Sequence, residues 1–398
     1  MRFIDYWVGV PLCLLLDGIN RIIRLLPFKA KEKMPAKVLF IKLSEMGAII
    51  LSYSLIKEVK KEYPHSEIFF LTFKKNKPLV EALDIIKPQN TLTISENSPW
   101  LFIWDTLRLI MRLRKEKMEM VFDLELFSRF TAILTYLSGA AKRIGFYRYH
   151  FEGLYRGNLL THNIQYNPLI HTSKSLLSLA QVMRAPGKTT PELEKKIEDR
   201  DIAIPKFVPS PEQLQQIRQR LSDLGISSTG RLFLINPGDG VIPSREWPVE
   251  NFAGLTKMLL EESDNYVIII GTGGVSRKAQ MFCQLVKNKR CLDLTNKTTL
   301  YELLSLFHIA EALIVNDCGL AHIASLTPVK KFVIFGPESP QLYAPLGENS
   351  RVLYANFPCS PCLSTFNHRE SACRESHCLQ AISPDEVYGL IKEHLRGR

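Results

Sequence analysis

The sequence lacks the features that would place it among secreted, transmembrane or repeat proteins. Its 398 residues contain no internal repeat and no low-complexity tract. No small-residue cleavage site follows the apolar N-terminus, and charges break its longest apolar stretch before it reaches the length of a transmembrane helix. Cys13, Cys283, Cys291 and Cys318 are scattered, without the spacing of a disulfide framework. These absences favour a cytoplasmic globular protein.

The composition is that of a folded chain with an excess of positive charge. Hydrophobic residues make up 46% and charged residues 23%, and the length exceeds one ordinary core, so two domains are expected. The formal net charge is +11. That excess favours anionic partners such as nucleotides, phosphorylated sugars, acidic lipid or nucleic acid, although a solvated basic surface would produce it too.

Residues 1–34 predict an amphipathic helix followed by a basic linker. Asp5 and Asp17 interrupt the apolar stretch. One helical face carries polar side chains and the other carries aliphatic ones, namely Asp17, Asn20, Arg21 and Arg24 against Ile19, Ile22, Ile23, Leu25 and Leu26. The basic residues that follow are Lys29, Lys31, Lys33 and Lys37. We predict that this helix lies on the cytoplasmic surface of the inner membrane, and the alternative is a helix packed on the domain body.

From Lys37 onward, short apolar runs alternate with amphipathic segments. The runs "KVLFIKL", "EIFFLTF" and "MEMVFDL" predict parallel strands covered on both faces, and a second series comprises "RLFLINPG", "NYVIIIGTGG", "EALIVNDCG" and "KKFVIFGP". The segments "AIILSYSLIKEVKKEY" and "SPWLFIWDTLRLIMRLRKEK" have helical periodicity. The alternation indicates an α/β protein built from doubly wound sheets.

A segment rich in proline and charge, residues 186–228, separates the two series and predicts an interdomain linker. The expected domains are therefore residues 35–185 and 229–398. In such folds ligands bind at the carboxyl ends of the strands, so we expect a ligand cleft between the two domains.

Two segments of the second domain have the composition of a phosphate site. Arg245 precedes a predicted helix, where its guanidinium could hold a diphosphate, although an Arg beside a Trp is more often a surface stack. "GTGGVSRKAQ" begins at Gly271 and supplies glycines at a strand-to-helix turn. Backbone N–H groups can approach a phosphate there, and a tight turn without a ligand is the alternative.

The segment "VNDCGLAHIAS" places a carboxylate, a glycine turn and an imidazole at another strand-to-helix junction. The N–H groups of Gly319 and Leu320 would begin the helix, and Asp317 could orient the turn or bind a sugar hydroxyl. His322 falls one turn into the helix. The alternative is a capped helix with a buried histidine.

Four cysteines lie close together near the C-terminus. Cys359, Cys362, Cys373 and Cys378 could close a tetrahedral zinc or iron site within residues 359–378, and reduced thiols in a loop are the alternative. Such a metal would be structural, because all four ligand positions are filled. No basic and aromatic cluster surrounds these cysteines, so no nucleic-acid partner is expected.

From about Lys37 to the C-terminus the chain resembles glycosyltransferase family 9, the bacterial heptosyltransferases of lipopolysaccharide core assembly. The resemblance is carried by "INPG" with "SREWPVENFAGL", "CLDLTNKTTLYELLSL", "IVNDCGLAHIASLTPVKKFVIFGPESPQLYAPLG" and "ISPDEV". It implies a GT-B fold, in which two Rossmann-like domains face a cleft and the C-terminal one holds most of a nucleotide-diphosphate sugar. Arg245 then stands where a basic residue contacts the diphosphate. Asp317 to His322 match the donor loop Asp-Thr-Gly-x-x-His, with Cys318 in the Thr place.

In the N-terminal domain the matching segment is "FIKLSEMGAIIL". The family usually has an aspartate, the candidate base, where this chain has Ala48. We therefore predict Glu45 as the base, with Asp123 and Glu125 in "VFDLELFSRF" as second choices. The alternative for Glu45 is an ordinary acid at a helix start. Lys42 and Arg129 are expected to help hold an acidic acceptor.

The sequence analysis thus predicts an inverting glycosyltransferase on the inner-membrane surface. It would move heptose from ADP-heptose to a lipopolysaccharide core or other lipid-linked acceptor, without a catalytic metal. Arg245, helix amides and His322 would neutralise the diphosphate. One alternative is a non-catalytic nucleotide-sugar binding protein, which Ala48 motivates. A third hypothesis is a nucleotide-sugar epimerase on the same fold, which would convert the donor without an acceptor.

Overall fold

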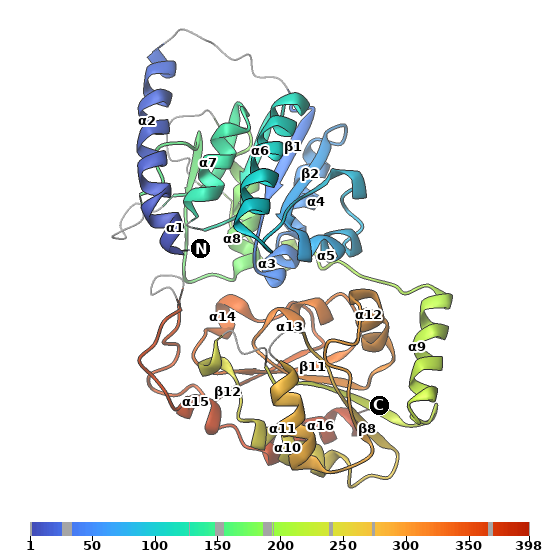
Figure 1. The fold of residues 1–398 in the computed structure, drawn as a ribbon. Coiled ribbons are helices and arrows are strands. Elements are labelled where there is room, and N and C mark those ends of the chain that lie inside the picture. Colours follow the sequence, from blue (N-terminus) through green and yellow to red (C-terminus); the bar gives the residue numbers. More distant parts are fainter. Residues whose placement is uncertain are drawn as a thin grey trace. The chain divides into compact units, whose positions relative to one another are not determined.

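The structure, a computed structural model, describes residues 2–25, 34–126, 128–147, 155–185, 193, 195–238, 242–272, 275–364 and 369–397. Lys29, Lys31, Lys33, Leu26, His368 and the last two glycines of "GTGG" lie outside these residues. The chain divides into two compact units, Met1–Ala203 and Ile204–Arg398 (Figure 1). Each unit is an α/β domain around its own sheet.

The described part of unit 1 contains a six-stranded sheet in the order β3-β2-β1-β4-β5-β6. Its strands are β1 Lys37–Ile41, β2 Glu67–Phe73, β3 Thr91–Ile94, β4 Met120–Asp123, β5 Lys142–Tyr147 and β6 His162–Gln165. All neighbouring pairs are parallel, and Phe40 of β1 pairs with Phe70 of β2 and Phe122 of β4. These three phenylalanines are fully buried, as expected for strands covered on both faces.

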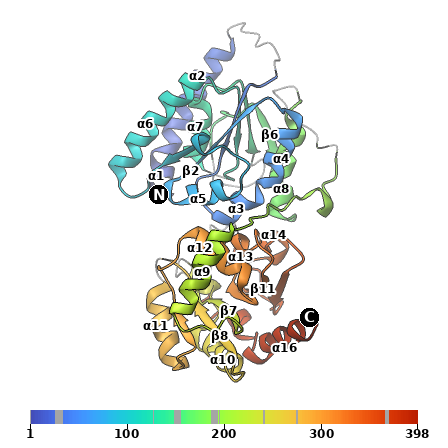
Figure 2. The same ribbon diagram turned by 90° about the vertical axis from the view of Figure 1, so that its right-hand side faces the viewer.

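Helices cover both faces of this sheet. The described helices after β1 are α3 Met46–Leu51, α4 Tyr53–Glu62, α5 Lys77–Ala82, α6 Pro99–Glu116, α7 Arg129–Leu137 and α8 Thr172–Ser178, with 3-10 turns at Lys74–Asn76, Pro88–Asn90, Leu179–Val182 and Asp199–Asp201. Helices α2, α6 and α7 lie on one face, and α4 and α8 lie on the other (Figures 1 and 2). The periodic segments that predict helices at residues 48–63 and 98–117 contain α4 and α6, which confirms both.

The predicted N-terminal helix is confirmed as α1, Arg2–Trp7, and α2, Gly9–Leu25. Its polar side faces the protein: Asp17 and Asn20 are each only 5% exposed. Asp17 accepts a hydrogen bond from the backbone N of Asn158 (3.2 Å), and the Asn20 amide donates to the carbonyl of the same residue (3.0 Å). The aliphatic side faces away from the domain. The helix therefore packs on the domain body and still leaves its apolar face exposed.

The described part of unit 2 repeats the architecture in the order β12-β11-β10-β7-β8-β9. Its strands are β7 Arg231–Asn236, β8 Asn265–Ile269, β9 Cys291–Asp293, β10 Ala312–Asn316, β11 Lys330–Phe335 and β12 Ser350–Tyr354, and all pairs are parallel. Its helices are α9 Pro211–Asp223, α10 Val249–Leu259, α11 Val275–Val286, α12 Leu300–Ile309, α13 Gly319–Ala324, α14 Pro340–Tyr343, α15 His377–Gln380 and α16 Pro384–Arg396, with a 3-10 turn at Pro243–Arg245.

Helix α9 lies within the segment that predicts a linker, residues 186–228. Ser210 starts it with a capping box, in which Ser210 and Gln213 exchange side-chain and backbone hydrogen bonds. Arg220 then pairs with Glu302 of α12 at 2.6 Å. The second half of this polar segment is thus an ordered part of unit 2.

Candidate active site

Each sheet has a topological switch point, where the chain connections on its two sides run in opposite directions. In unit 1 it lies between β1 and β4, and in unit 2 between β7 and β10. Ligands of open α/β sheets bind beside the carboxyl ends of the strands at such points. Residues 42–45, 124–125, 237–238 and 317–318 follow these strands, and Asp123 is the last residue of β4. The predicted residues Lys42, Glu45 and Asp317 therefore lie at the switch points.

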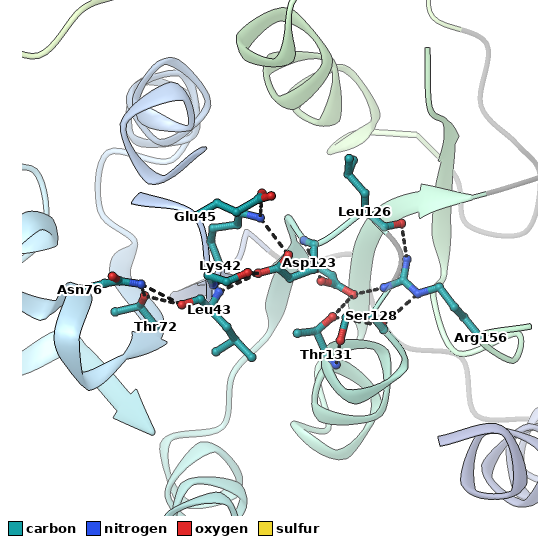
Figure 3. Close-up of polar contacts among 12 residues, drawn as sticks. Lys42, Leu43, Glu45, Thr72, Asn76, Asp123, Leu126, Ser128, Thr131 and Arg156 are labelled. Carbon is teal, nitrogen blue, oxygen red and sulfur yellow. Dashed lines mark hydrogen bonds and ion pairs between the residues drawn. The ribbon is translucent and has the colours of Figure 1, made fainter. Parts of the chain in front are cut away.

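Lys42 is the centre of the switch point in unit 1. Its Nζ lies 2.8 Å from Glu125 Oε2 and 3.0 Å from Glu45 Oε2, and its side chain is 3% exposed (Figure 3). Burial disfavours the ammonium, but the two carboxylates outweigh it and raise the pKa of Lys42. Lys42 is expected to help hold an acidic acceptor, and in the structure its ammonium contacts two acids of its own domain.

Glu125 connects the β4 loop to the β1 loop. Its Oε1 accepts hydrogen bonds from the backbone N of Leu43 (2.9 Å) and of Ser44 (3.2 Å), while its Oε2 faces Lys42. Both oxygens of this largely buried carboxylate are therefore engaged with the loop that ends at Glu45. The residue fixes the shape of the loop.

Glu45 has the most exposed carboxylate of this group, with a side chain 42% accessible. Its φ is +65°, in the left-handed region. A non-glycine residue in that region costs about 1 kcal/mol, and such residues concentrate at functional sites. Ala48, where the family has its aspartate, lies in the first turn of α3 and contributes only a methyl group.

Asp123 is fully buried beneath this loop. Its Oδ2 accepts a hydrogen bond from Thr131 Oγ1 (3.1 Å) and forms an ion pair with Arg156 (Figure 3). Arg156 also donates to the carbonyls of Ser128 (3.1 Å) and Leu126 (3.2 Å). Burial raises the pKa of Asp123 to about 6, against the opposing effect of Arg156. Without exposed surface, this carboxylate cannot meet a substrate in the conformation described.

Arg129 is not beside Lys42 but under the N-terminal helix. Its guanidinium lies 3.1 Å from Asp5 and donates to the carbonyl of Tyr155 (2.8 Å), and its side chain is 3% exposed. Asp5 also accepts from the backbone N of Arg129 and Phe130, so it caps α7. The expectation that Arg129 holds the acceptor is therefore wrong, because docking of α1 takes up this side chain.

In unit 2 the switch point carries two arginines and two acids. Arg245 Nη2 donates to Asp317 Oδ2 at 2.6 Å and to the Asp317 carbonyl at 2.7 Å, and Nη1 lies 3.6 Å from Glu338. Arg369 Nε lies 3.2 Å from the same Glu338 carboxylate. We refer to Arg245, Asp317, Glu338 and Arg369 as the arginine cluster. Burial raises the pKa of Asp317, although Arg245 opposes the shift.

Sequence reasoning did not single out Glu338, Arg369 or Arg156. Glu338 follows β11 in "FGPESP", the same position after a strand that draws attention to Asp317 after β10. The criterion that polar residues in the loop after a strand are site candidates would therefore have identified Glu338. Arg369 comes from the C-terminal segment and meets the cluster through tertiary structure alone.

The loop that carries Arg245 is anchored by a buried tryptophan. Trp247 is 1% exposed, so it is not a surface stack. Its backbone N donates to Asn316 Oδ1 and its indole N–H to the carbonyl of Ile382, both at 2.9 Å. The β7 and β10 loops are thereby tied together, which brings Arg245 to Asp317.

The remaining predicted donor residues lie around α13 and β8. Cys318, Gly319 and Leu320 are half-buried at the start of α13, and His322 is 7% exposed inside its first turn. Gly271 follows β8 with φ +149°, and its carbonyl accepts from the backbone N of Asn296 (2.8 Å). The structure places the α13 start directly after Asp317.

The C-terminal cysteines are thiols, not disulfides. Cys359 and Cys373 are exposed and Cys378 is buried. Burial raises the pKa of Cys378, and the neighbouring Cys362, Cys359 and Cys373 contribute in the same direction. Within the described residues, which exclude His368, no group of three or more His, Cys, Asp or Glu side chains is placed to hold a metal ion. The metal site predicted for the four cysteines therefore stays a prediction.

The sequence contains one Asp-x-Asp stretch, Asp199 to Asp201. Asp199 pairs with Lys174 at 2.7 Å, and Asp201 accepts from the backbone N of Glu198 at 2.9 Å. Both carboxylates therefore have local partners in unit 1.

Two doubly wound domains, each with charged loops at its switch point, have the architecture of the GT-B class. The profile of Glycosyltransferase family 9 (heptosyltransferase) matches residues 106–372. The chain belongs to this family.

Named relatives extend the match over most of the chain. It is 23% identical to lipooligosaccharide heptosyltransferase 2 of Haemophilus ducreyi, covering 80% of this chain and 88% of the relative. Lipopolysaccharide heptosyltransferase 2 of Salmonella typhimurium is 22% identical, covering 80% and 87%. The solved structure of E. coli ADP-heptose lps heptosyltransferase II superposes with a TM-score of 0.70 over 91% of this chain and 99% of that one, at 20% identity. The non-catalytic alternative gains no support from these matches.

Proposed function

We propose that this glycosyltransferase transfers heptose from ADP-heptose to a lipopolysaccharide core acceptor, with inversion at the sugar carbon. The single observation that carries the proposal is the family match over residues 106–372, which includes Asp123, Glu125 and the arginine cluster. The two named relatives are heptosyltransferases of lipopolysaccharide or lipooligosaccharide. The cytoplasmic face of the inner membrane is the proposed place of the reaction.

Glu45 is the proposed general base. It accepts the proton of the acceptor hydroxyl while that oxygen attacks the anomeric carbon and the bond from this carbon to the diphosphate oxygen breaks. Glu45 is exposed and its carboxylate is held 3.0 Å from the Lys42 ammonium, which orients it. Asp123 is fully buried against Arg156 and takes the role of supporting the β4 loop.

The arginine cluster is the proposed site of the leaving diphosphate. Two guanidiniums meet two carboxylates there, with Glu338 at 1% and Asp317 at 5% side-chain exposure. A diphosphate would add negative charge beside Arg245 and Arg369, where planar guanidiniums offer paired donors. Asp317 then acts by holding Arg245 in place instead of binding a sugar hydroxyl.

The N-terminal helix is the proposed membrane element. Residues Asp5–Ile23 are long and apolar enough to cross a membrane by length and composition. However, Asp17 and Asn20 are bonded to Asn158 of the domain, which fits a helix lying in the interface beside the domain better than one that spans the bilayer. The lipid-linked acceptor would be reached from that surface.

A nucleotide panel tests the donor proposal. Purified full-length protein is heated with ADP, UDP, GDP or CMP, alongside Arg245→Ala and the control Arg351→Ala, which replaces an exposed arginine of β12. We expect ADP alone to raise Tm in the wild type and the control, and not in Arg245→Ala. ADP release from ADP-heptose in the presence of core acceptor then reports turnover.

Selective stabilisation by UDP or GDP would replace the proposed donor and keep the transferase. No stabilisation by any nucleotide, together with no ADP release, would contradict the proposed function.

A further inference from the structure

Helix α6 carries an apolar outer surface that none of the described residues of unit 1 covers. Its inner side buries Leu109 and Leu113 in the core with β1, β2 and β4. Its outer side exposes Trp100 (81%), Trp104 (59%) and Met111 (64%), with Leu101, Ile103 and Leu107 between them. A helix on a globular domain normally has a polar outer face, so this surface needs a reason.

The exposed apolar residues are concentrated, not scattered. Of the 22 large hydrophobic side chains exposed among the described residues, fifteen belong to α6 or to the N-terminal helix α1–α2. Three of the four tryptophans of the chain, Trp7, Trp100 and Trp104, are in this group, while Trp247 is buried. Contiguous apolar surface of this kind marks an interaction site, and tryptophan suits a membrane interface because it has one polar edge.

The two helices lie on the same face of the sheet, with α7 between them (Figures 1 and 2). On one side of α7, Cys13 of α2 is packed with Ala132 and Leu159. On its other side, the rings of Phe102 of α6 and Phe130 of α7 lie 4.9 Å apart. The apolar surfaces of α2 and α6 therefore belong to one side of unit 1.

The charges on α6 identify the partner. The C-terminal half of its outer side is basic, with exposed Arg108, Arg112, Arg114, Lys115 and Lys117. Its acids are both engaged: Asp105 accepts from the backbone N of Ser95 (2.9 Å), and Glu116 pairs with Lys37. Apolar side chains bordered by cations, without an exposed acid, complement an anionic bilayer.

We infer that α6 is a second membrane-binding helix of this protein. The surface formed by α1–α2 and α6 would lie on anionic lipid, with Trp7, Trp100 and Trp104 at headgroup depth and Arg108 and Arg112 beside lipid phosphates. The inference rests on the proposed location at the membrane and adds to it. Two helices fix the orientation of unit 1 on the bilayer, which one helix cannot do.

Vesicle binding of the full-length protein tests this. Sedimentation with vesicles of equimolar phosphatidylethanolamine and phosphatidylglycerol is compared with phosphatidylcholine vesicles, for wild type, the double variant Trp100→Ser with Trp104→Ser, and the control Leu169→Ser. Leu169 is 72% exposed in unit 1 outside this surface. We expect the double variant to lower the partition coefficient on anionic vesicles by about tenfold, and the control to leave it unchanged.

Two further double variants distinguish the contribution of α2 from that of α6, and apolar contacts from ionic ones. Ile19→Ser with Ile22→Ser should also weaken binding, and Arg108→Gln with Arg112→Gln should remove most of the preference for anionic vesicles. Unchanged binding in the Trp100, Trp104 variant, with loss in the Ile19, Ile22 variant, would overturn the role of α6 and leave the N-terminal helix as the anchor. Wild type that binds neither vesicle would overturn it as well.

A separate readout keeps this test apart from the proposed function. The Tm increase with ADP and ADP release in detergent should be equal in wild type and the α6 variants, because none of these residues is part of either proposed switch-point site. Loss of those signals in wild type would instead speak against the transferase proposal.

Discussion

The two switch points carry charge in different ways. In unit 1 a single buried ammonium, Lys42, holds two carboxylates, one of which, Glu45, is 42% exposed. In unit 2 two guanidiniums and two carboxylates balance each other, and both acids are at most 5% exposed. The switch points of the two domains occupy the same place in the topology. One has an accessible carboxylate, and the other has a buried cluster in which the charges balance.

This difference indicates that the two switch points have different roles. An exposed carboxylate on a strained loop can meet a substrate proton, whereas a buried cluster chiefly fixes where its arginines lie. Substitutions should therefore affect turnover in unit 1 and stability in unit 2, and the following predictions test that contrast in order of expected size.

The largest effect is expected for Glu45→Gln. The amide keeps the size of the side chain but cannot accept the proton, so ADP release should fall about a thousandfold. The Tm increase with ADP should be retained, because Glu45 belongs to the other domain. Glu58→Gln, at a half-exposed position of α4 whose side chain lies 3.8 Å from Lys61 Nζ, serves as the control. Normal turnover in Glu45→Gln would show that Glu45 is not the base. The proposed difference in role between the two switch points would then be wrong.

Arg245→Ala should destabilise the protein as well as remove donor binding. It leaves the buried carboxylate of Asp317 without the guanidinium 2.6 Å away, and breaking a buried pair in this way costs about 4 kcal/mol. Urea unfolding of Arg245→Ala, Asp317→Asn and the double variant measures the coupling. If the double variant is not more stable than Arg245→Ala, the cluster is not a coupled unit.

Asp123 gives a pH dependence that separates support from catalysis. Its folded-state pKa of about 6 lies above the ordinary 3.8, so the folded protein binds this proton more tightly than the unfolded chain. Its contribution to the free energy of unfolding should fall by about 3 kcal/mol as the pH rises from about 4 to about 6, and stay constant above. Asp123→Asn should lack this fall.

The measurement is the difference between the two stability profiles over that pH range, which cancels the other titrating groups. Parallel profiles for wild type and Asp123→Asn would show that Arg156 cancels the effect of burial and that Asp123 has no raised pKa.

The smallest effect is expected for Cys359→Ser and Cys373→Ser. Both thiols are exposed, unlike the arginine cluster of the same domain, so each change should alter the free energy of unfolding by less than about 0.5 kcal/mol. Metal analysis of the purified protein accompanies the unfolding curves. Stoichiometric zinc or iron in the wild type, lost in these variants, would confirm the predicted metal site.

Much of the fold could be predicted because buried parallel strands are recognisable in a single sequence. "EIFFLTF" coincides with β2, and "KVLFIKL" and "RLFLINPG" contain β1 and β7. No apolar run in the sequence predicted β3, β5, β6, β9 or β12. All but β5 are edge strands, and a strand that is not covered on both faces lacks the continuous apolar run. The internal strand β5, Lys142–Tyr147, is broken by Lys142, Arg143 and Gly145.

The sequence allowed the residues of the candidate site to be predicted from their positions after strands, but not the residues with which they interact. Loops after strands identified Lys42, Glu45, Asp123, Arg245 and Asp317. The sequence could not show that Asp123 is buried against Arg156, that Arg129 is held by Asp5, or that Arg369 reaches Glu338. Each of these pairs joins residues at least 31 positions apart, and local patterns carry no information about such distances.

By itself, the sequence determined that this protein is a two-domain α/β chain with charged loops at the strand ends, because periodicity and loop residues are local properties. Only the tertiary structure decided which acid is exposed and which is buried, and which face of the N-terminal helix is turned outward. Burial depends on what packs against a residue, so the same Asp or Trp can support a loop, form a core or meet a membrane according to its neighbours.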